Sequence, residues 1–302
     1  MHMQLNPIVK KDIKVQSRSM RICFSVFGYE LILALVFFIA MMIIEAENRY
    51  STSNIYQSMA NLYPVLGVAQ LCILGVIVPI RTASAISGEK ERQTFDIMMT
   101  TAMTPFSVVM GKVTSAIIQS MFFVIASMPI MALVFIIGGL SWGYLFLYLG
   151  LALLASFFAA SIGIFCSSLC KKTISAVIMA YGFYLIFFVG TFIPLICTGV
   201  LWSTASNYGA GELAVEVSLL VLLMNPAILI VEFFVQLLGG SSFVSGFRDL
   251  LSNNGTNVFD PMYYLTQGKC WLVVSTVVFI LVSLFFLWMA ALRINPVKRR
   301  NK

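Results

Sequence analysis

Long apolar runs are the feature of this sequence that most restricts its fold. Six of them are long enough, at about 1.5 Å of helix rise per residue, to cross about 30 Å of hydrocarbon. They lie at residues 23–44, 62–80, 113–138, 143–169, 174–197 and 271–292. Strands of a membrane barrel are shorter, at about 9–11 residues. With 60% of its residues hydrophobic and only 10% charged, the chain is predicted to be an all-α membrane protein rather than a soluble enzyme, a secreted domain or a disordered chain.

The basic residues predict how the chain is inserted. If the six runs span the membrane, both chain ends lie on one side. That side carries all of the 19 Lys and Arg residues except Arg49, Arg248 and Lys269. Because basic residues favour the cytoplasmic face, the N- and C-termini are predicted to be cytoplasmic. We therefore expect a multi-pass protein of the plasma membrane.

A seventh apolar run, at residues 213–238, is predicted not to cross. A seventh crossing would place the basic tail Lys298-Arg299-Arg300 outside the cell. Asn225-Pro226 also interrupts the run, and proline removes a donor and breaks a helix. We expect two short helices that form a re-entrant hairpin within an outer segment at 198–270, where non-helical backbone must be covered by protein.

The membrane domain, residues 23–292, lies between two short cytoplasmic segments. Residues 1–22 form an arm in which apolar and basic side chains gather on opposite faces of a helix. Such an amphipathic helix lies in the membrane plane, with its basic face toward anionic headgroups. Its function is either a simple anchor or an elbow that passes motion into the first span, and periodicity leaves both open. Residues 293–302 form a basic tail.

The residues that most enzyme sites need are missing. The single histidine, His2, lies at the N-terminus, which excludes a histidine metal site or a catalytic triad. Paired carboxylates and cysteine–histidine sets do not occur in the runs, and a phosphate-binding loop of the form G-x-x-x-x-G-K-[ST] is absent. The chain is therefore predicted to be no enzyme, to bind no metal, and to hold no cofactor of its own.

The six cysteines are scattered, without a C-x-x-C pair, at Cys23, Cys72, Cys166, Cys170, Cys197 and Cys270. Small apolar packing residues are the main interpretation. Cys197 and Cys270 both fall near the outer ends of predicted spans, which leaves a disulfide between them as an alternative.

The loop after the second run holds an unusual share of the charges. Its sequence from residue 88 is Gly-Glu-Lys-Glu-Arg-Gln-Thr-Phe-Asp, followed by three apolar residues. The composition favours a short amphipathic helix from Glu89 to Met99. Thr104-Pro105 ends it, since the residue before proline leaves the α region. This helix, in a loop at 86–106, is either a solvated connector or a docking site for a soluble subunit.

At these residues the sequence resembles a known family. The pattern Glu-x-Glu-Arg-x-Thr-aromatic-acid, then Thr-x-x-Thr-Pro and Gly-Lys, is similar to that of the ABC type-2 permeases, the six-span membrane subunits of ATP-driven exporters. The resemblance extends to the Asn6-Pro7 arm, the six spans and the long outer segment, although only 86–112 is specific. Members of the family often have glycine where Gln93 stands and proline where Ala102 stands.

The resemblance implies a set of partners and contacts. The 88–99 helix would be the coupling helix that docks into a separate nucleotide-binding ATPase subunit, and residues 5–21 would be the connecting helix. A second permease subunit, identical or different, would complete the pathway in the lipid bilayer. ATP and Mg²⁺ would bind in the ATPase, and no nucleic acid is expected as a partner. The docking residues would be Glu89, Glu91, Arg92, Thr94, Phe95 and Asp96.

Inside the membrane, a few polar and small residues have more than one interpretation. Glu30 is the only acidic residue within the six predicted spans; it serves either a structural role or the transport pathway. Because spans two and five line the route in the resembling family, the further pathway candidates are Gln70, Tyr181 and Tyr184. Residues with small side chains recur at four-residue spacing in the fourth run, which predicts close helix packing, and they are Ala155, Ala159 and Gly163.

Other function classes remain as alternatives. A non-transporting membrane component of a sensing or immunity complex would have the same architecture. An ion-coupled carrier is less compatible, because such carriers show internal repeats and several intramembrane charges. The cargo is open, and an aromatic, nearly uncharged interior favours amphipathic or apolar molecules.

Overall fold

The computed structural model describes residues 14, 20–48, 62–95, 105–137, 141–204, 210–239, 242–246, 265–266 and 268–294. Within these ranges the chain is helical apart from short turns, and no strand occurs in them. The helices of these ranges that are long and apolar enough to span a membrane number six: Ile22–Ala46, Leu62–Glu91, Phe106–Ala126, Trp142–Leu169, Thr173–Thr198 and Lys269–Ile294. The predicted all-α class and its six candidate spans are thus confirmed. Most of the N-terminal arm and the tail from residue 295 lie outside the described ranges.

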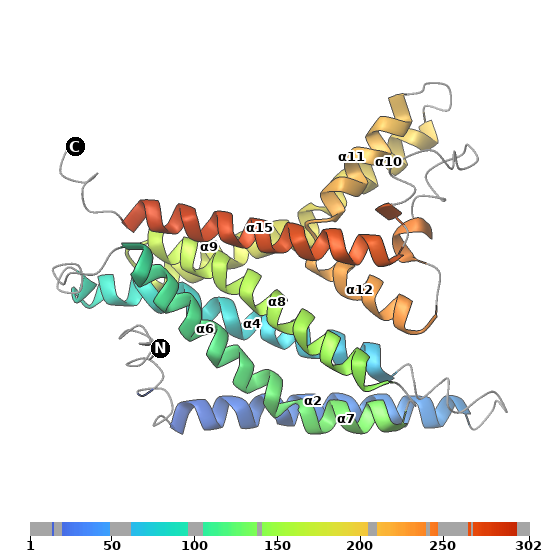
Figure 1. The fold of residues 1–302 in the computed structure, drawn as a ribbon, viewed down its shortest axis with the longest axis horizontal. Helices are drawn as coiled ribbons and strands as arrows, with labels where there is room; N and C mark the ends of the chain where they lie inside the picture. Colours follow the sequence, from blue (N-terminus) through green and yellow to red (C-terminus); the bar gives the residue numbers. More distant parts are fainter. Residues whose placement is uncertain are drawn as a thin grey trace, which may run out of the picture. The chain divides into compact units, whose positions relative to one another are not determined.

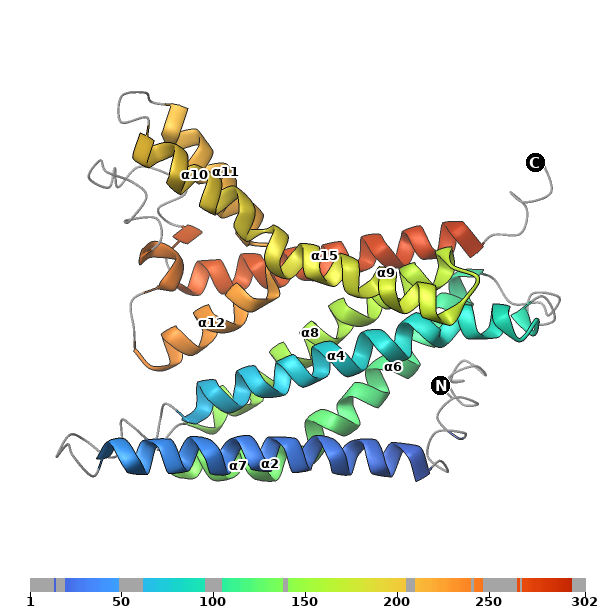
Figure 2. The ribbon, with the colours of Figure 1, turned by 180° about the vertical axis from the view of Figure 1, so that it is seen from behind.

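The chain divides into two units, which are described separately. The first unit comprises Met1–Tyr181 and Ser283–Lys302. It contains α2 (Met20–Asn48), α4 (Leu62–Glu91), α6 (Pro105–Ala126), α7 (Met128–Ile137), α8 (Trp142–Leu169), most of α9 (Thr173–Leu185) and the end of α15 (Gly268–Ile294). α4 and α8 lie side by side at its centre; α6 packs on α8, and α2 packs on α4 and α6 (Figures 1 and 2).

Small residues on α8 let it approach α4 closely. A Cβ atom on Gly163 would lie 2.0 Å from Oγ1 of Thr82, so only glycine fits there. One turn farther on, Oγ of Ser167 accepts the amide protons of Ile86 at 2.9 Å and of Ser87 at 2.8 Å. Of the predicted packing residues, Ala159 and Gly163 are buried and Ala155 is half-buried.

The second span is longer than the sequence predicted. α4 has 30 residues, about 45 Å of helix, and therefore exceeds the hydrocarbon thickness by about 15 Å. Residues 88–91, predicted to open a separate coupling helix over 88–99, instead form the last turn of α4, and the chain turns at 92–94. The predicted helix start is wrong because the polar residues after Arg81 still pack on α8, which sustains the helix. Residues 96–99 lie outside the described ranges.

The third span was predicted too far along the chain. The apolar run at 113–138 is divided between α6 and α7, which are separated at Ser127. Pro129, in the first turn of α7, has no amide proton to continue the helix of α6. At the other end, Pro105 begins α6, since a fixed φ suits the first helical position. The third span therefore begins with residues 106–112, which include polar side chains and lie before the predicted apolar run.

The second unit comprises Gly182–Val282. The fifth span enters it and passes through a π-helical turn, η1 (Ile186–Gly190), into α10 (Phe192–Thr204). α11 (Ala210–Leu222) packs along α10. α12 (Pro226–Leu237) follows α11, and residues 216–222 meet α12 at 90°. An apolar cluster fills this corner; it consists of Leu195, Leu219, Leu222, Leu223, Ile228, Val244 and Trp271.

Two buried polar side chains stabilise the turns of the second unit. Asn225 caps α12 by accepting the amide protons of Ala227 at 2.8 Å and Ile228 at 3.4 Å. Its amide nitrogen donates to the carbonyl of Phe188 in η1, at 3.0 Å. Glu232 is fully buried and accepts the amide proton of Phe243 at 2.9 Å. The break therefore lies where the sequence placed it, at Asn225-Pro226.

The disulfide between Cys197 and Cys270, which the sequence left as an alternative, is not formed in the structure. Cys197 and Cys270 both carry free thiols, and both side chains are exposed. Two bridged cysteines bury each other's sulfur atoms, whereas these two side chains point outward from their helices. The structure therefore agrees with the main interpretation, in which Cys197 and Cys270 are not paired.

Candidate functional site

The candidate site lies at the end of α4, where three consecutive charged residues contact three different helices. The first is Glu89. Its Oε1 accepts a hydrogen bond from Nζ of Lys112, in α6, at 2.8 Å. The Lys112 side chain is only 9% exposed and that of Glu89 25%, so this ion pair is shielded from solvent and fixes α6 to α4.

The second residue, Lys90, binds the end of α8. Its ammonium group donates to the main-chain carbonyls of Ser167 and Cys170, both at 3.4 Å, and to that of Ser168 between them. The last carbonyls of a helix have no partner within the helix, and a cation there is favoured by the helix dipole. Lys90 therefore caps α8 from a neighbouring helix.

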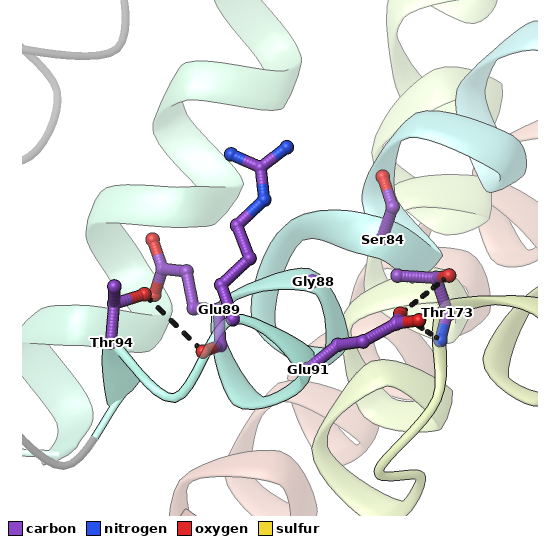
Figure 3. A pocket seen from close by; sticks show the side chains of 7 residues that line it. Ser84, Gly88, Glu89, Glu91, Thr94 and Thr173 are labelled. Atoms are coloured by element: carbon purple, nitrogen blue, oxygen red, sulfur yellow. Dashed lines mark hydrogen bonds between the residues drawn. The ribbon is translucent and has the colours of Figure 1, made fainter.

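The third residue, Glu91, binds the start of α9. Oε2 of Glu91 accepts the amide proton of Thr173 at 3.2 Å and its hydroxyl proton at 2.9 Å (Figure 3). A carboxylate at a helix N-terminus satisfies free amide groups and is favoured by the dipole. Lys90 and Glu91 thus have the charges that the end of α8 and the start of α9 each favour.

A tight turn follows these three residues and exposes a tip, defined as Arg92, Gln93 and Thr94. The amide of Thr94 donates to the carbonyl of Glu89 at 3.0 Å, and that of Gln93 to the carbonyl of Lys90 at 3.2 Å. These two bonds form a Schellman motif, which requires a left-handed residue. Gln93 takes this conformation, with φ of 59°, at the position where the resembling family often has glycine.

Replacing Gln93 by glycine is expected to raise the free energy of unfolding by about 1 kcal/mol, because glycine adopts a positive φ without a steric penalty. Thermal unfolding of the solubilised protein would measure the change. Ser84→Gly, at an exposed helical position of α4, is the control and is expected to lower stability by about 0.5 kcal/mol. Equal effects of the two glycines would contradict the assignment of the turn.

Beside the tip lies an open hollow of about 740 Å³. Figure 3 shows Glu91 and Thr173 directed toward each other at one side of it, with Ser84 nearby. The hollow is lined by Ser84, Gly88, Glu89, Glu91, Arg92, Thr94 and Thr173. Solvent therefore reaches the bond between Glu91 and Thr173, but not the buried end of Lys112.

Comparison with known proteins decides the family. Residues 3–208 match the family model of the ABC-2 type transporter. The chain belongs to this family. The match covers well over half of the chain, including the arm, the cytoplasmic loop and the first five spans. No curated protein matches the chain in sequence. The protein is therefore a multi-pass membrane component of an ABC-type transporter, a role that is typically not catalytic.

The structure separates the predicted docking residues of this permease into three groups. Arg92 and Thr94 are exposed on the tip. Glu89 and Glu91 are directed to other helices of the same chain. Phe95 is 8% exposed and lies 5.7 Å from Nζ of Lys90, measured to the ring centroid, so it offers no free apolar patch. Asp96 lies outside the described ranges.

The sequence interpretation missed the partners of this site. Lys90, Lys112 and Thr173 were not among its candidates, although each contacts a predicted docking residue or a helix end. The available signal was the charge pattern: in a chain with few charges, an isolated lysine near the start of a span requires a partner. The Gly-Lys at 111–112 is such a position, and Glu89 is its partner.

The pathway candidates lie apart from this site and have partners of their own. Gln70 is fully buried; its amide donates to Oγ of Ser127 at 2.8 Å, and the hydroxyl of Tyr148 lies 3.1 Å from its Oε1. Tyr181 donates to the carbonyl of Val76 at 2.6 Å. In the second unit, the ring of Tyr184 packs on that of Phe188, 4.8 Å away.

Glu30, the remaining pathway candidate, is half-buried on α2. One of its carboxylate oxygens, Oε1, is buried and has no hydrogen-bond partner in the described ranges. A buried carboxylate oxygen without a donor is costly. Of the four pathway candidates, Glu30 is therefore the one whose burial is least explained by contacts within the described ranges.

Proposed function

We propose that this permease forms the translocation pathway of an ATP-driven exporter whose ATPase is a separate chain. The observation that carries the proposal is the exposed tip at the end of a 30-residue helix. Glu89 and Lys90 fix the base of the tip to α6 and α8. A protrusion held in this way loses little conformational entropy on binding, which suits a docking contact. ATP and Mg²⁺ are bound and hydrolysed in the partner.

The same contacts support a route for mechanical coupling. α4 runs from the tip to Leu62, so a displacement of the tip moves a whole span. The ion pair of Glu89 and the cap formed by Lys90 pass that displacement to α6 and α8. In the proposed cycle, ATP draws two ATPase subunits together, the tips move with them, and the pathway opens outward past the 198–270 segment. We propose that aromatic side chains of the fifth span line this pathway and favour amphipathic or apolar cargo.

A second permease subunit, identical or different, is part of the proposal. The most apolar 18-residue windows of the first and fifth spans are only 11% and 17% buried within the chain, against 61% for the fourth span. These two spans therefore have the most surface left for lipid or for a second subunit. Many large apolar side chains of α2 are exposed, and this helix lies at the edge of its unit (Figure 2).

The proposed orientation places the tip and both chain ends in the cytoplasm, in the plasma membrane. The ends of four helices meet at the site, and basic residues gather there: Lys90, Arg92, Lys112, Lys171 and Lys172. Basic residues beside span ends favour the cytoplasmic face. This is also the face on which an ATPase has access to ATP.

Reversing the charge of Arg92 tests the docking site. Because a like-charge contact in an interface is strongly unfavourable, Arg92→Glu is expected to lower the yield of co-purified ATPase about tenfold. The measurement is the ratio of ATPase to permease after gentle solubilisation. Arg293→Glu, at an exposed position in the last turn of α15, is the control and is expected to leave the ratio unchanged. An unchanged ratio for Arg92→Glu would show that the tip is not the docking site.

A further inference from the structure

We propose that Glu91 and Thr173 form a latch between α4 and the start of the fifth span, and that they act as positioning residues rather than as docking contacts. The inference rests on the proposed function, because it describes how motion of the tip reaches one particular span. The name latch refers here to the two hydrogen bonds from Thr173 to Oε2 of Glu91, at 3.2 Å and 2.9 Å.

The first argument is that α9 has no anion of its own at its N-terminus. Its first turn contains no acidic residue, and the two residues that precede it are Lys171 and Lys172. Positive charge at this end of a helix is unfavourable. Glu91 of α4 supplies the carboxylate that the sequence of α9 lacks. The contact therefore stabilises the N-terminus of α9.

The second argument is the difference in burial among the three contacts of the site. Lys112, the partner of Glu89, is 9% exposed, and Lys90 contacts three carbonyls of α8 at once. Glu91 is exposed, and the hollow of about 740 Å³ lies beside its bond to Thr173. Water can replace the partner of Glu91 at little cost, but it has no such access to Lys112. The latch is therefore the contact that opens first when the tip is pulled.

The third argument is what the latch holds. α8 is the most deeply buried span, with 61% of its apolar window covered, whereas the fifth span is covered over only 17%. A span with few contacts moves more readily than a packed one. α8 and α9 are joined by only Cys170, Lys171 and Lys172. When the latch opens, Lys90 keeps α8 in place, while the start of α9 can tilt between this short corner and the bond from Tyr181 to the carbonyl of Val76.

The latch can be distinguished from a docking role by two substitutions on opposite sides of it. Glu91→Ala removes the acceptor, and Thr173→Val removes the hydroxyl while keeping the shape of the side chain. In the complex reconstituted in lipid nanodiscs, both variants are expected to retain the wild-type amount of ATPase and to change its ATP turnover in the same direction. The change is expected to be about fivefold for Thr173→Val, which loses one of the two hydrogen bonds, and larger for Glu91→Ala, which loses both. The double variant should match Glu91→Ala, because removal of the carboxylate already removes the bond that Thr173→Val deletes.

Thr173→Ser keeps the hydroxyl group and loses the methyl group, and it is expected to keep the wild-type ATP turnover. If Thr173 acted only through the shape of its side chain, Thr173→Val would keep the wild-type turnover instead. If Glu91→Ala releases the ATPase while Thr173→Val does not, Glu91 is a docking contact and the latch is wrong. If neither variant changes turnover, the latch is also wrong.

A second measurement is independent of the partner. In the solubilised permease alone, hydrogen exchange of the Thr173 amide is expected to be about fivefold faster in Glu91→Ala than in the wild type. An unchanged rate would overturn the latch. If instead the wild-type permease binds no ATPase, the proposed function fails, while this exchange experiment still decides whether the latch exists.

Discussion

Replacing Gly163 by alanine is expected to force α4 and α8 apart and to lower the free energy of unfolding by about 3 kcal/mol, as overpacking does in a closely packed interior. The added Cβ would lie 2.0 Å from Oγ1 of Thr82, 2.9 Å from its Cβ and 3.2 Å from the amide nitrogen of Ala83. Rotation of the Thr82 side chain relieves only the first of these contacts. The other two involve atoms that move only with the backbone of α4, so the helices themselves must separate.

Separation of α4 and α8 should also disturb the candidate site, because the site includes contacts between these two helices. Oγ of Ser167, one turn from Gly163, accepts two amide protons of α4, and Lys90 caps the end of α8. The measurement is the half-life of monodisperse protein in mild detergent at a fixed temperature, since membrane proteins often unfold irreversibly. Gly150→Ala is the matched control on the same helix: its Cβ would meet no atom within 4 Å. Similar half-lives for the two variants would refute close packing at Gly163.

The positions of the spans could be predicted because a run of apolar residues is a local property of the sequence. All six candidate spans of the structure overlap the predicted runs. The ends were missed where polar residues continue a helix, as in residues 81–91 of α4. Those residues stay helical because Ser167 and other groups of α8 satisfy or cover them, and such contacts between distant segments are not visible in the local pattern.

The candidate site shows the same division between local and distant information. The segment around Gly88-Glu-Lys-Glu-Arg was recognisable from its residues, and the structure places the exposed tip there. The roles of its side chains were not recognisable, because they depend on partners elsewhere: Lys112 is 23 residues from Glu89, and Thr173 is 82 residues from Glu91. A pattern of charges predicts that partners exist, but only the fold decides which helix end lies opposite each charge.

Replacing Asn225 by alanine is expected to be the most damaging change in the second unit, at about 3 kcal/mol, because it leaves several buried polar groups without partners. Asn225 is fully buried. Its Oδ1 caps α12, and its Nδ2 donates to the carbonyl of Phe188 at 3.0 Å and to Oγ1 of Thr191 at 2.7 Å. Phe188 lies in the π-helical turn η1, so one side chain stabilises both the 90° corner and the irregular turn of the fifth span.

Asn225→Ser separates the two contributions, because serine also caps a helix but is too short to reach Phe188 and Thr191. If the cap alone mattered, Asn225→Ser would resemble the wild type in its half-life at a fixed temperature. We expect it instead to lose about 2 kcal/mol, with alanine costing about 1 kcal/mol more for the missing cap. Thr191→Val combined with Asn225→Ser should cost less than the sum of the two changes, because both remove the same bond. Additive losses would show that the bond between Asn225 and Thr191 contributes nothing, and a wild-type half-life of Asn225→Ser would show that Asn225 acts only as the cap of α12.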